Sequence, residues 1–593
     1  MTPIVDPRGG DLEDDASSTK RRSLVALAGS LLAEISFARL AVVWLLLIGL
    51  PALLLGAAPF LASIWLDIVL SKSRILFADV WPVLALPVLA ALGWLGGRRL
   101  LRLAETSFWS LNALAVQPIY ILFREGLLHL AERLVLTRLG RARRAAVRGV
   151  AAVVAGATIC GLGIALVALM WPASRWTGSL TDLVAPMRLL PVLLANGIVL
   201  VSAYFAVAGL VWSLADATMD QPRTLESFAV APVGGRTWRI AHLSDLHVVG
   251  ERYGFRVESG REGPCGNERF RQVLTRLDEL HATHRLDAIL MTGDLTDAGR
   301  SAEWVELFAC LASFPRLARL VVGLPGNHDV NVVDRANPAR LELPGSPTQR
   351  LRQIRTLSAL DMLHGTRLRV VDRKAGSLGG ALNDALAPHA LDMAAFADTG
   401  SSRLSGSLSR LWTEVFPMVL PPDPEDGLGI IVLNSSAETH FSFTNALGLV
   451  STEQMRGLEI AVRQYPRAGW IVALHHHVVE YPRPAKALSE RIGTALVNGS
   501  WFVRRLRRLS DRMAIMHGHR HIDWIGACGN LLIVSAPSPV MQATDMDEAH
   551  FYVHSFTIDD AGSLVLLAPE RITLPGLPAI QERTVEQTKS REA

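Results

Sequence analysis

Residues 320–329 read Leu-Val-Val-Gly-Leu-Pro-Gly-Asn-His-Asp and join an apolar run to three polar side chains. The apolar part, 320–324, has the length and composition of a buried strand. Pro325 and Gly326 favour a turn directly after that strand. Asn327, His328 and Asp329 therefore stand together at a predicted strand end. In open α/β sheets, functional groups collect beyond the carboxyl ends of the strands, so this stretch predicts both an α/β fold and the place of a site.

Four more polar motifs follow predicted strands in the same half of the chain. The strands are expected at 238–244, 287–292, 470–474 and 513–516, with helices between them at 268–281, 301–314 and 451–463. Further strands are expected at 429–433, 531–534 and 551–558. This alternation indicates a layered α/β domain. The four motifs are Asp245-Leu246-His247, Gly293-Asp294-Leu295-Thr296-Asp297, His475-His476-His477 and Gly518-His519-Arg520-His521.

These side chains are suitable ligands for a pair of metal ions. Two-metal hydrolases hold their ions about 3.5–4 Å apart, and at least one carboxylate must reach both. Asp294 is the natural bridge because it closes the second strand between the other two motifs of that sheet. Asp245 and His247 would lie far apart along a regular strand, so the backbone should bend there to bring both side chains to one metal.

The motifs, taken in this order, resemble the signature of the calcineurin-like metallophosphoesterases over residues 238 to about 560. The resemblance implies a four-layer α/β/β/α sandwich. It also implies two divalent or mixed-valence ions, drawn from manganese, iron, zinc or magnesium. The implied ligands of the first ion are Asp245, His247, Asp294 and His521. The implied ligands of the second ion are Asp294, Asn327, His475 and His519.

The same resemblance assigns catalytic roles to the residues that are not ligands. His328 would face the phosphate and protonate the leaving group, and Asp329 would orient His328. Asp297 would support the metal ligands without binding a metal itself. In the histidine triplet, the family pattern puts the ligand at His475. His476 and His477 remain alternatives if the strand ends one residue later.

Within the family, Gly-Asn-His-Asp argues against the lipid A pathway pyrophosphatases, which carry arginine in place of that histidine. The chain is more similar to the bacterial cyclic-nucleotide phosphodiesterases, which implies attack on phosphorus by a metal-bridging hydroxide. One alternative is a hydrolase of membrane-derived lipid or nucleotide-sugar phosphoesters. A second is a non-catalytic membrane scaffold or sensor with a retired site, which the complete ligand set disfavours.

The chain is more apolar than most soluble proteins, because half of all its residues are hydrophobic and the mean hydropathy is +0.29. The long uncharged runs lie in its first 230 residues. A spanning helix needs about 20 apolar residues, and long uncharged runs of this kind are rare in soluble cores. We therefore expect an all-α transmembrane domain at 40–233. Its four uncharged runs are 40–66, 80–97, 149–174 and 189–215.

Charges between the runs set the expected orientation. The loop 98–148 carries ten arginines and three glutamates, whereas the loops on the other side carry few cations. The positive-inside rule then places this loop, the N-terminal tail and the catalytic domain in the cytoplasm, beneath a multi-pass inner membrane. The loop is expected either to lie on the anionic inner leaflet or to pack as solvated helices on the catalytic domain.

The length of the chain indicates several domains. The 593 residues are too many for one core. We expect a tail at 1–39, the membrane domain at 40–233, the catalytic domain at 234–575 and a flexible tail at 576–593. Residues 331–427 should form an inserted cap near the site, or a surface insertion without function.

Charge and cysteine content limit the possible partners and covalent links. A formal charge of +4 indicates no nucleic-acid polymer as partner. The four scattered cysteines indicate no disulfide framework, and the sequence does not indicate an oligomeric state.

Overall fold

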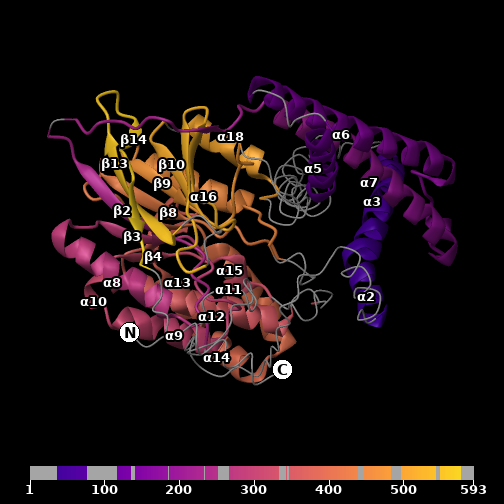
Figure 1. The fold of residues 1–593 in the computed structure, drawn as a ribbon. Helices are drawn as coiled ribbons and strands as arrows, with labels where there is room; N and C mark the ends of the chain where they lie inside the picture. The colour runs from indigo at the N-terminus through magenta and orange to yellow at the C-terminus, as the bar shows by residue number, and fades with distance from the viewer. Residues whose placement is uncertain are drawn as a thin grey trace, which may run out of the picture. The chain divides into compact units, whose positions relative to one another are not determined.

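A computed structural model gives the protein as two compact units, one holding residues 36–219 with 486–488, the other residues 1–35, 220–485 and 489–593 (Figure 1). Each unit is described by itself. The structure describes residues 37–76, 116–134, 141–184, 186–232, 234–250, 266–332, 342, 346–438, 446–482, 496–509, 511–541 and 548–575.

The regular secondary structure described in the first unit is all helical. Three of its helices are long and apolar enough to cross a membrane, over Leu50–Ser71, Ala146–Ala173 and Met187–Ala217. They correspond to three of the four predicted runs. The run at 80–97 lies outside the described residues, so the number of four spans stays a prediction. The helices are α2 (Phe37–Trp44), the π-helix η1 (Leu45–Gly49), α3 (Leu50–Leu76), α5 (Gln117–Leu134), α6 (Arg141–Met170), η4 (Trp171–Ala173), η5 (Leu180–Val184) and α7 (Pro186–Ala217).

Glycines let the long helices of this unit pack closely. A Cβ added to Gly56 of α3 would lie 1.8 Å from the carbonyl oxygen of Leu193 in α7. A Cβ on Gly163 of α6 would lie 2.7 Å from the carbonyl oxygen of Ser202, also in α7. Large apolar side chains such as Trp65 and Leu169 remain exposed, at 63% and 67%. Small residues between helices and apolar ones outside are typical of membrane bundles.

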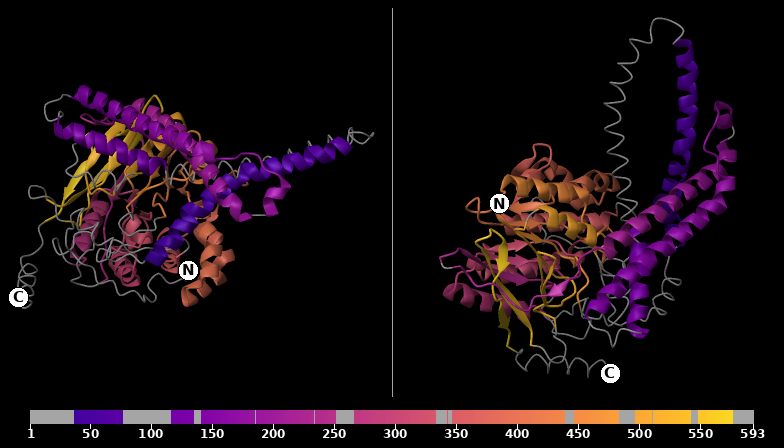
Figure 2. Two further views of the ribbon diagram at one scale, coloured as in Figure 1. Left: turned by 90° about the vertical axis from the view of Figure 1, so that its right-hand side faces the viewer. Right: turned by 90° about the horizontal axis from the view of Figure 1, so that it is seen from above.

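The second unit contains two sheets, which Figure 1 shows from one side and Figure 2 from two others. In the six-stranded sheet the path is β14-β13-β2-β3-β4, with β15 paired to β13. β2, β3 and β4 run parallel to one another, and β13 is antiparallel to β2. The bounds are β2 (Thr237–Leu243), β3 (Ala288–Met291), β4 (Val321–Gly323), β13 (His550–Ile558), β14 (Leu564–Leu566) and β15 (Glu570–Thr573).

The other sheet has nine strands in the order β1-β11-β12-β10-β9-β8-β7-β5-β6. Its centre, from β8 through β9 and β10 to β12, is parallel. The bounds are β1 (Arg223–Thr224), β5 (Arg369–Asp372), β6 (Ser377–Ala381), β7 (Met418–Leu420), β8 (Leu428–Val432), β9 (Gly469–Ala473), β10 (Met513–His517), β11 (Trp524–Cys528) and β12 (Leu531–Ser535).

Helices complete this unit, and several share a core with the strands. Phe270 and Val273 of α8 lie in the same buried cluster as Ile240 of β2. The mixed α/β fold agrees with the prediction, whereas the four-layer order stays a prediction. The helices are α8 (Glu268–Thr283), α9 (Ser301–Ala312), α10 (Pro315–Ala318), α11 (Asn327–Val330), α12 (Pro347–His364), α13 (Leu382–Leu386), η6 (Ala387–His389), α14 (Ala390–Thr399), α15 (Ser402–Val415), α16 (Thr452–Gln464) and α18 (Gly499–Leu509).

The segment 331–427 was expected to form an inserted cap near the site or a surface insertion without function, and both stay predictions. It supplies β5, β6 and β7 to the nine-stranded sheet. Ile354 and Leu360 of α12 are buried in the cluster that also holds Val322 of β4. The described part of this segment is therefore continuous with the sheet and the core.

Candidate metal centre

The five polar motifs follow five parallel strands, three in one sheet and two in the other. Asp245 and His247 follow β2, Asp294 follows β3, and Asn327 follows β4. His475 follows β9, and the Gly518-His519-Arg520-His521 motif follows β10. Carboxyl ends of neighbouring parallel strands lie at one edge of a sheet. Backbone bonds join the motifs across the edges: the Asp245 amide donates to the Gly293 carbonyl at 3.1 Å, and the Gly518 amide donates to the His475 carbonyl at 3.0 Å.

The backbone at five of the seven predicted ligands is left-handed. Five non-glycine residues have positive φ among those that the structure describes, and all five are predicted ligands. This conformation costs roughly 1–2 kcal/mol per residue, and such strain clusters at functional sites. It also supplies the bend that the Asp-x-His spacing required. The φ angles are 55° at Asp245, 41° at His247, 49° at Asp294, 74° at His519 and 51° at His521.

Glycines in the motifs allow main chain to approach the ligands. A Cβ on Gly326 would lie 2.1 Å from both the amide nitrogen and Oδ1 of Asp294. A Cβ on Gly518 would lie 2.5 Å from Oδ2 of Asp245. Real side chains do not tolerate such distances, so only glycine fits at these two positions.

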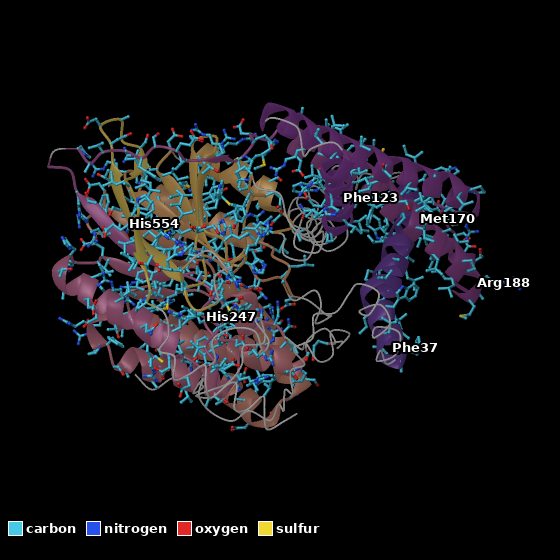
Figure 3. All side chains as sticks on the ribbon, viewed as in Figure 1. Phe37, Phe123, Met170, Arg188, His247 and His554 are labelled. Atoms are coloured by element: carbon cyan, nitrogen blue, oxygen red, sulfur yellow. The ribbon has the colours of Figure 1, made fainter. Side chains whose placement is uncertain are left out.

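Asp245, His247 and His521 offer one ligand atom each within 4.8 Å of one another. His521 Nε2 lies 3.3 Å from Asp245 Oδ1. His247 Nε2 lies 3.6 Å from Asp294 Oδ2, which connects this group to the next. Figure 3 places His247 within the catalytic unit. The arrangement brings together the four residues expected around the first ion.

Asp294, His475 and His519 form a second group, whose ligand atoms also lie within 4.8 Å of one another. His475 Nε2 lies 3.2 Å from Asp294 Oδ2, and His519 Nδ1 lies 3.1 Å from His475 Nε2. Asn327 Oδ1 is 3.1 Å from His475 Nε2. The same oxygen of Asp294 thus lies near a ring of each group, as a bridging carboxylate requires.

Neighbouring atoms fix the ring of His475. Its Nδ1 lies 2.8 Å from the carbonyl oxygen of Thr292, and a carbonyl can only accept. Nδ1 therefore carries the proton, and Nε2 is left for a metal. His476 instead places Nδ1 2.9 Å from Ser435 Oγ, and His477 places Nε2 3.3 Å from Glu480 Oε1. Of the triplet, His475 is the residue that reaches Asp294.

Asp329 was expected to orient His328, which stays a prediction, and the hydrogen bonds of its carboxylate run to the two neighbouring turns. Its carboxylate accepts hydrogen bonds from the amides of Gly326 and Thr296, both at 2.8 Å, and from the Thr296 hydroxyl at 2.6 Å. The ring of His328 is held by the carbonyl oxygen of Asp297, 2.6 Å from Nδ1. Asp329 therefore ties the turn after β4 to the turn after β3, and the main chain of Asp297 orients His328.

Asp297 also contacts a predicted ligand through its side chain. Its Oδ1 lies 3.2 Å from His247 Nδ1, which leaves His247 Nε2 toward Asp294. A carboxylate hydrogen-bonded behind a ligating histidine would fix the tautomer and raise the basicity of the ring. The distance here is that of an ion pair without hydrogen-bond geometry, so the supporting role of Asp297 stays a prediction.

Burial and charge oppose each other at these groups. Burial disfavours the charged form of Asp294, but the rings of His475 and His328 outweigh it and hold the pKa of Asp294 well below its usual range. Burial likewise lowers the pKa of His475, yet Asp294 and then Asp245 raise it to about 9. Burial lowers the pKa of His519 strongly, aided by the neighbouring rings. Without metal, the centre is thus held together by a carboxylate–imidazolium pair.

The residues present fit a pair of cations. His247 Nε2 and His519 Nε2 are buried and have no hydrogen-bond partner in the described part of the protein. Buried polar atoms seldom lack partners, and a metal would supply one. Imidazole, carboxylate and amide donors suit manganese, iron, zinc or magnesium. A further group, His247, Asp297 and His328, also meets the distance criterion.

Two supporting serines were missed by the sequence reading. Ser538 Oγ donates to the carbonyl oxygen of Asp245 at 2.8 Å. Ser435 Oγ accepts from the amides of His475 and His476, each at 3.1 Å. Ser435 follows a predicted strand, which was a usable signal. Nothing in the sequence around Ser538 marks it.

Comparison with known proteins points to one family. Residues 239–376 match the family model described as calcineurin-like phosphoesterase. No curated protein matches the chain.

Solved structures that align with part of the chain include the following three. A dimetal phosphatase from Danio rerio is 12% identical, with a TM-score of 0.33, over 57% of this chain and 99% of its own. A putative 5'-nucleotidase from Staphylococcus aureus is 10% identical, with a TM-score of 0.30, over 60% of this chain and 58% of its own. A purple acid phosphatase from yellow lupin is 10% identical, with a TM-score of 0.26, over 57% and 52%.

Proposed function

We propose that the chain, whose residues 239–376 match the calcineurin-like phosphoesterase family model, is a membrane-anchored, two-metal phosphoester hydrolase. The proposed ligands are Asp245, His247, Asp294 and His521 for one ion, and Asp294, Asn327, His475 and His519 for the other. The proposed reaction is hydrolysis of a phosphodiester at the cytoplasmic face of a membrane, with a cyclic nucleotide as the first candidate substrate.

The observation that carries the proposal is the left-handed backbone at five of the seven proposed ligands. Few non-glycine residues adopt this conformation, although aspartate and histidine do so more often than most. The strained residues come from three separate strand ends, and their side chains converge on Asp294 and His475. Strain that recurs at converging ligands supports a site that is kept for binding.

The two ions, when bound, would offset the negative charge of the phosphoryl group and lower the pKa of a nearby water. The chain's own contribution is to hold both sets of ligands around one carboxylate. Asp294 Oδ1 accepts the amide of His328 at 2.9 Å, so the bridging residue also positions the proposed general acid. Asp329 keeps the two turns in register through its four main-chain and hydroxyl contacts.

His328 is proposed to donate a proton to the leaving oxygen. Its Nδ1 lies against the Asp297 carbonyl and must carry a hydrogen. A second proton on Nε2 would make the ring an imidazolium, which can both stabilise developing charge and protonate an alkoxide. The position of His328 next to Asn327 and beside His247, with ring centroids 4.6 Å apart, supports this role.

A second candidate is hydrolysis of lipid or nucleotide-sugar phosphoesters drawn from the membrane. The observation that favours it is the presence of three candidate spans in the same chain. An anchor of this kind would keep the site near such substrates without further contacts.

The test uses the full chain in detergent micelles, supplied with manganese. Hydrolysis of bis-p-nitrophenyl phosphate, p-nitrophenyl phosphate, cyclic AMP and a mixed phospholipid extract would be measured in parallel. Asn327→Ala and His328→Gln are the site variants. His284→Gln, an exposed histidine beyond α8, is the matched control.

The proposal predicts metal-dependent hydrolysis that both site variants lose and the control retains. Faster cleavage of the diester than of the monoester supports the phosphodiesterase, and cleavage of the phospholipids alone supports the second candidate. If no ester is cleaved with manganese, iron, zinc or magnesium, the chain is a scaffold or sensor and the proposal fails.

A further inference from the structure

Helix α12 turns a polar side toward the loops of the candidate metal centre. Positions three and four residues apart lie on one side of a helix, and four buried polar side chains of α12 follow this spacing. They are Gln349, Arg352, Arg355 and Thr356. Burying guanidinium groups is costly unless they are hydrogen-bonded or paired. The hydrogen bonds of these side chains therefore identify what α12 supports.

Three of the four side chains donate to carbonyl oxygens of two loops at the site. Arg355 Nη1 donates to Gly299 at 3.0 Å, in the loop after β3. Arg352 Nη1 donates to Asn331 at 2.8 Å, at the end of α11. Thr356 Oγ1 donates at 3.0 Å to Asp329 in α11 itself. A helical threonine commonly returns its hydroxyl to the carbonyl one turn earlier, so a hydroxyl that reaches another element links the two.

The same two loops set the orientation of the His328 ring. His328 is part of α11, and its Nδ1 lies 2.6 Å from the carbonyl oxygen of Asp297, two residues before Gly299. A Cβ added to Gly299 would lie 2.6 Å from the carbonyl oxygen of Asp329, so the two loops are in close contact. The hydroxyl on α12 thus holds the main chain that carries the ring, and the guanidinium holds the main chain that orients it.

The core in turn fixes α12. Ile354, Leu357 and Leu360 are buried in the cluster that also holds Val322 of β4. Figure 1 labels α11 and α12 side by side, and the two helices are in contact. A helix packed in this way is a rigid support for a reacting group. Such support matters because a misplacement of about 1 Å can cost roughly 10²-fold in rate.

We propose that Arg355 and Thr356 are positioning residues that aim the ring of His328 at the leaving oxygen of the substrate. The inference rests on the proposed function, in which His328 is the general acid. When the P–O bond breaks, the leaving oxygen keeps the bonding electron pair and takes the proton from His328 Nε2. A basic leaving group needs this proton more than an acidic one does. Loss of the positioning contacts should therefore slow esters of weakly acidic alcohols most.

The test uses the full chain in detergent micelles with manganese and three symmetrical diesters. These are bis-p-nitrophenyl, bis-p-chlorophenyl and diphenyl phosphate, whose leaving phenols become progressively less acidic. Thr356→Val removes the hydroxyl and keeps the shape, whereas Thr356→Ser keeps the hydroxyl. Arg355→Lys keeps the charge but not the planar group that donates to Gly299. Ser358→Ala is the matched control, because Ser358 is also buried on α12 and its hydroxyl has no hydrogen-bond partner in the described part of the protein.

Thr356→Val and Arg355→Lys should slow the cleavage of diphenyl phosphate roughly 10–100-fold, and that of bis-p-nitrophenyl phosphate less than about 3-fold. The rate should thus depend more steeply on the acidity of the leaving phenol. Thr356→Ser and Ser358→Ala should keep the wild-type dependence. An unchanged dependence in both positioning variants, equal slowing of all three esters, or the same change in Ser358→Ala would overturn the proposal.

Hydrogen–deuterium exchange of a peptide covering residues 326–331 gives a second readout that needs no activity. Exchange should be several-fold faster in Thr356→Val than in the wild type, and unchanged in Thr356→Ser and Ser358→Ala. Equal exchange in all four proteins would overturn the support of α11 by α12. If the wild-type chain cleaves none of the esters while exchange changes as expected, the proposed function fails and the contact between the helices stands.

Discussion

The two units of this protein place polar and apolar groups in opposite ways. In the catalytic unit, carboxylates and imidazoles such as Asp245 and His475 are fully buried. In the helical unit, large apolar side chains such as Trp65 and Leu169 are exposed. Buried ionisable groups are costly unless they are paired or bind metal, and large apolar side chains exposed together mark contact with lipid or protein.

Glycine shows how differently the units are built. In both units, a missing Cβ lets backbone approach closely, at Gly326 against Asp294 and at Gly56 against Leu193. In the catalytic unit the approach serves a ligand held in a strained conformation. In the helical unit it serves ordinary helix packing. The same substitution should therefore damage both metal binding and stability in the catalytic unit, and stability alone in the helical unit.

The largest effect is expected at the shared carboxylate. Asp294→Asn keeps the shape but removes the charge that both ligand groups approach. Loss of several kcal/mol of stabilisation should reduce kcat/KM by roughly 10³-fold or more. Bound metal per chain, measured by elemental analysis, should fall together with the rate. A variant that retains both would show that Asp294 is not a bridge.

Gly326→Ala should come next. The new Cβ would lie 2.1 Å from main-chain and side-chain atoms of Asp294, so the turn must shift. Overpacking of this kind costs about 1–3 kcal/mol, and the shift should also weaken metal binding. Thermal unfolding and metal content would be compared with Gly406→Ala on α15, where a Cβ meets nothing within 4 Å. Equal behaviour of the two variants would contradict the account of this turn.

A smaller effect is expected at Asp297. Its carboxylate contacts His247 Nδ1 but belongs to neither proposed ligand set. Asp297→Asn should lower metal affinity or activity by about 10–100-fold, as is usual for residues behind a ligating histidine. Metal titration at fixed pH measures the change. An effect as large as that of Asp294→Asn would indicate that Asp297 is itself a ligand, as the group with His247 and His328 allows.

The helical unit should show the reverse pattern. Gly56→Ala should lower the free energy of unfolding of the helical unit by about 1–3 kcal/mol, while the metal content of the protein stays unchanged. Gly161→Ala on α6 is the matched control, because a Cβ there meets nothing within 4 Å. The control should be neutral or slightly stabilising. A loss of metal in Gly56→Ala would contradict the separation of roles between the units.

The strands that carry the site could be predicted because they are short apolar runs closed by polar motifs. The run before Asn327 became β4, and the run before Asp245 became β2. Each observed boundary lies within about one residue of the expected one. The candidate spans were visible for the same reason, since length and apolar content are local properties.

Other parts depend on contacts that the sequence does not display. α12 buries Arg352 and Arg355, which donate to the carbonyl oxygens of Asn331 and Gly299. Buried arginines remove the apolar periodicity by which a core helix is recognised. The three strands β5, β7 and β6 then pair at the far edge of the sheet, and their short, mixed sequences give little signal.

The roles of Asp329 and His475 show the same limit. The resemblance implied that Asp329 orients His328, whereas the turn directs its carboxylate to Thr296 and Gly326. The choice among three consecutive histidines needed the strand end at Ala473 and the Thr292 carbonyl. In both cases the backbone direction after a strand decided which atoms meet.

The most direct test of a metal pair bridged by Asp294 is a crystal structure of the full chain from crystals grown with manganese. Anomalous scattering would locate the ions. The account predicts two ions about 3.5–4 Å apart. Asp294 should touch both, with Asp245, His247 and His521 on one side and Asn327, His475 and His519 on the other. A single ion held by His247, Asp297 and His328, or no ion between the two sheets, would contradict it.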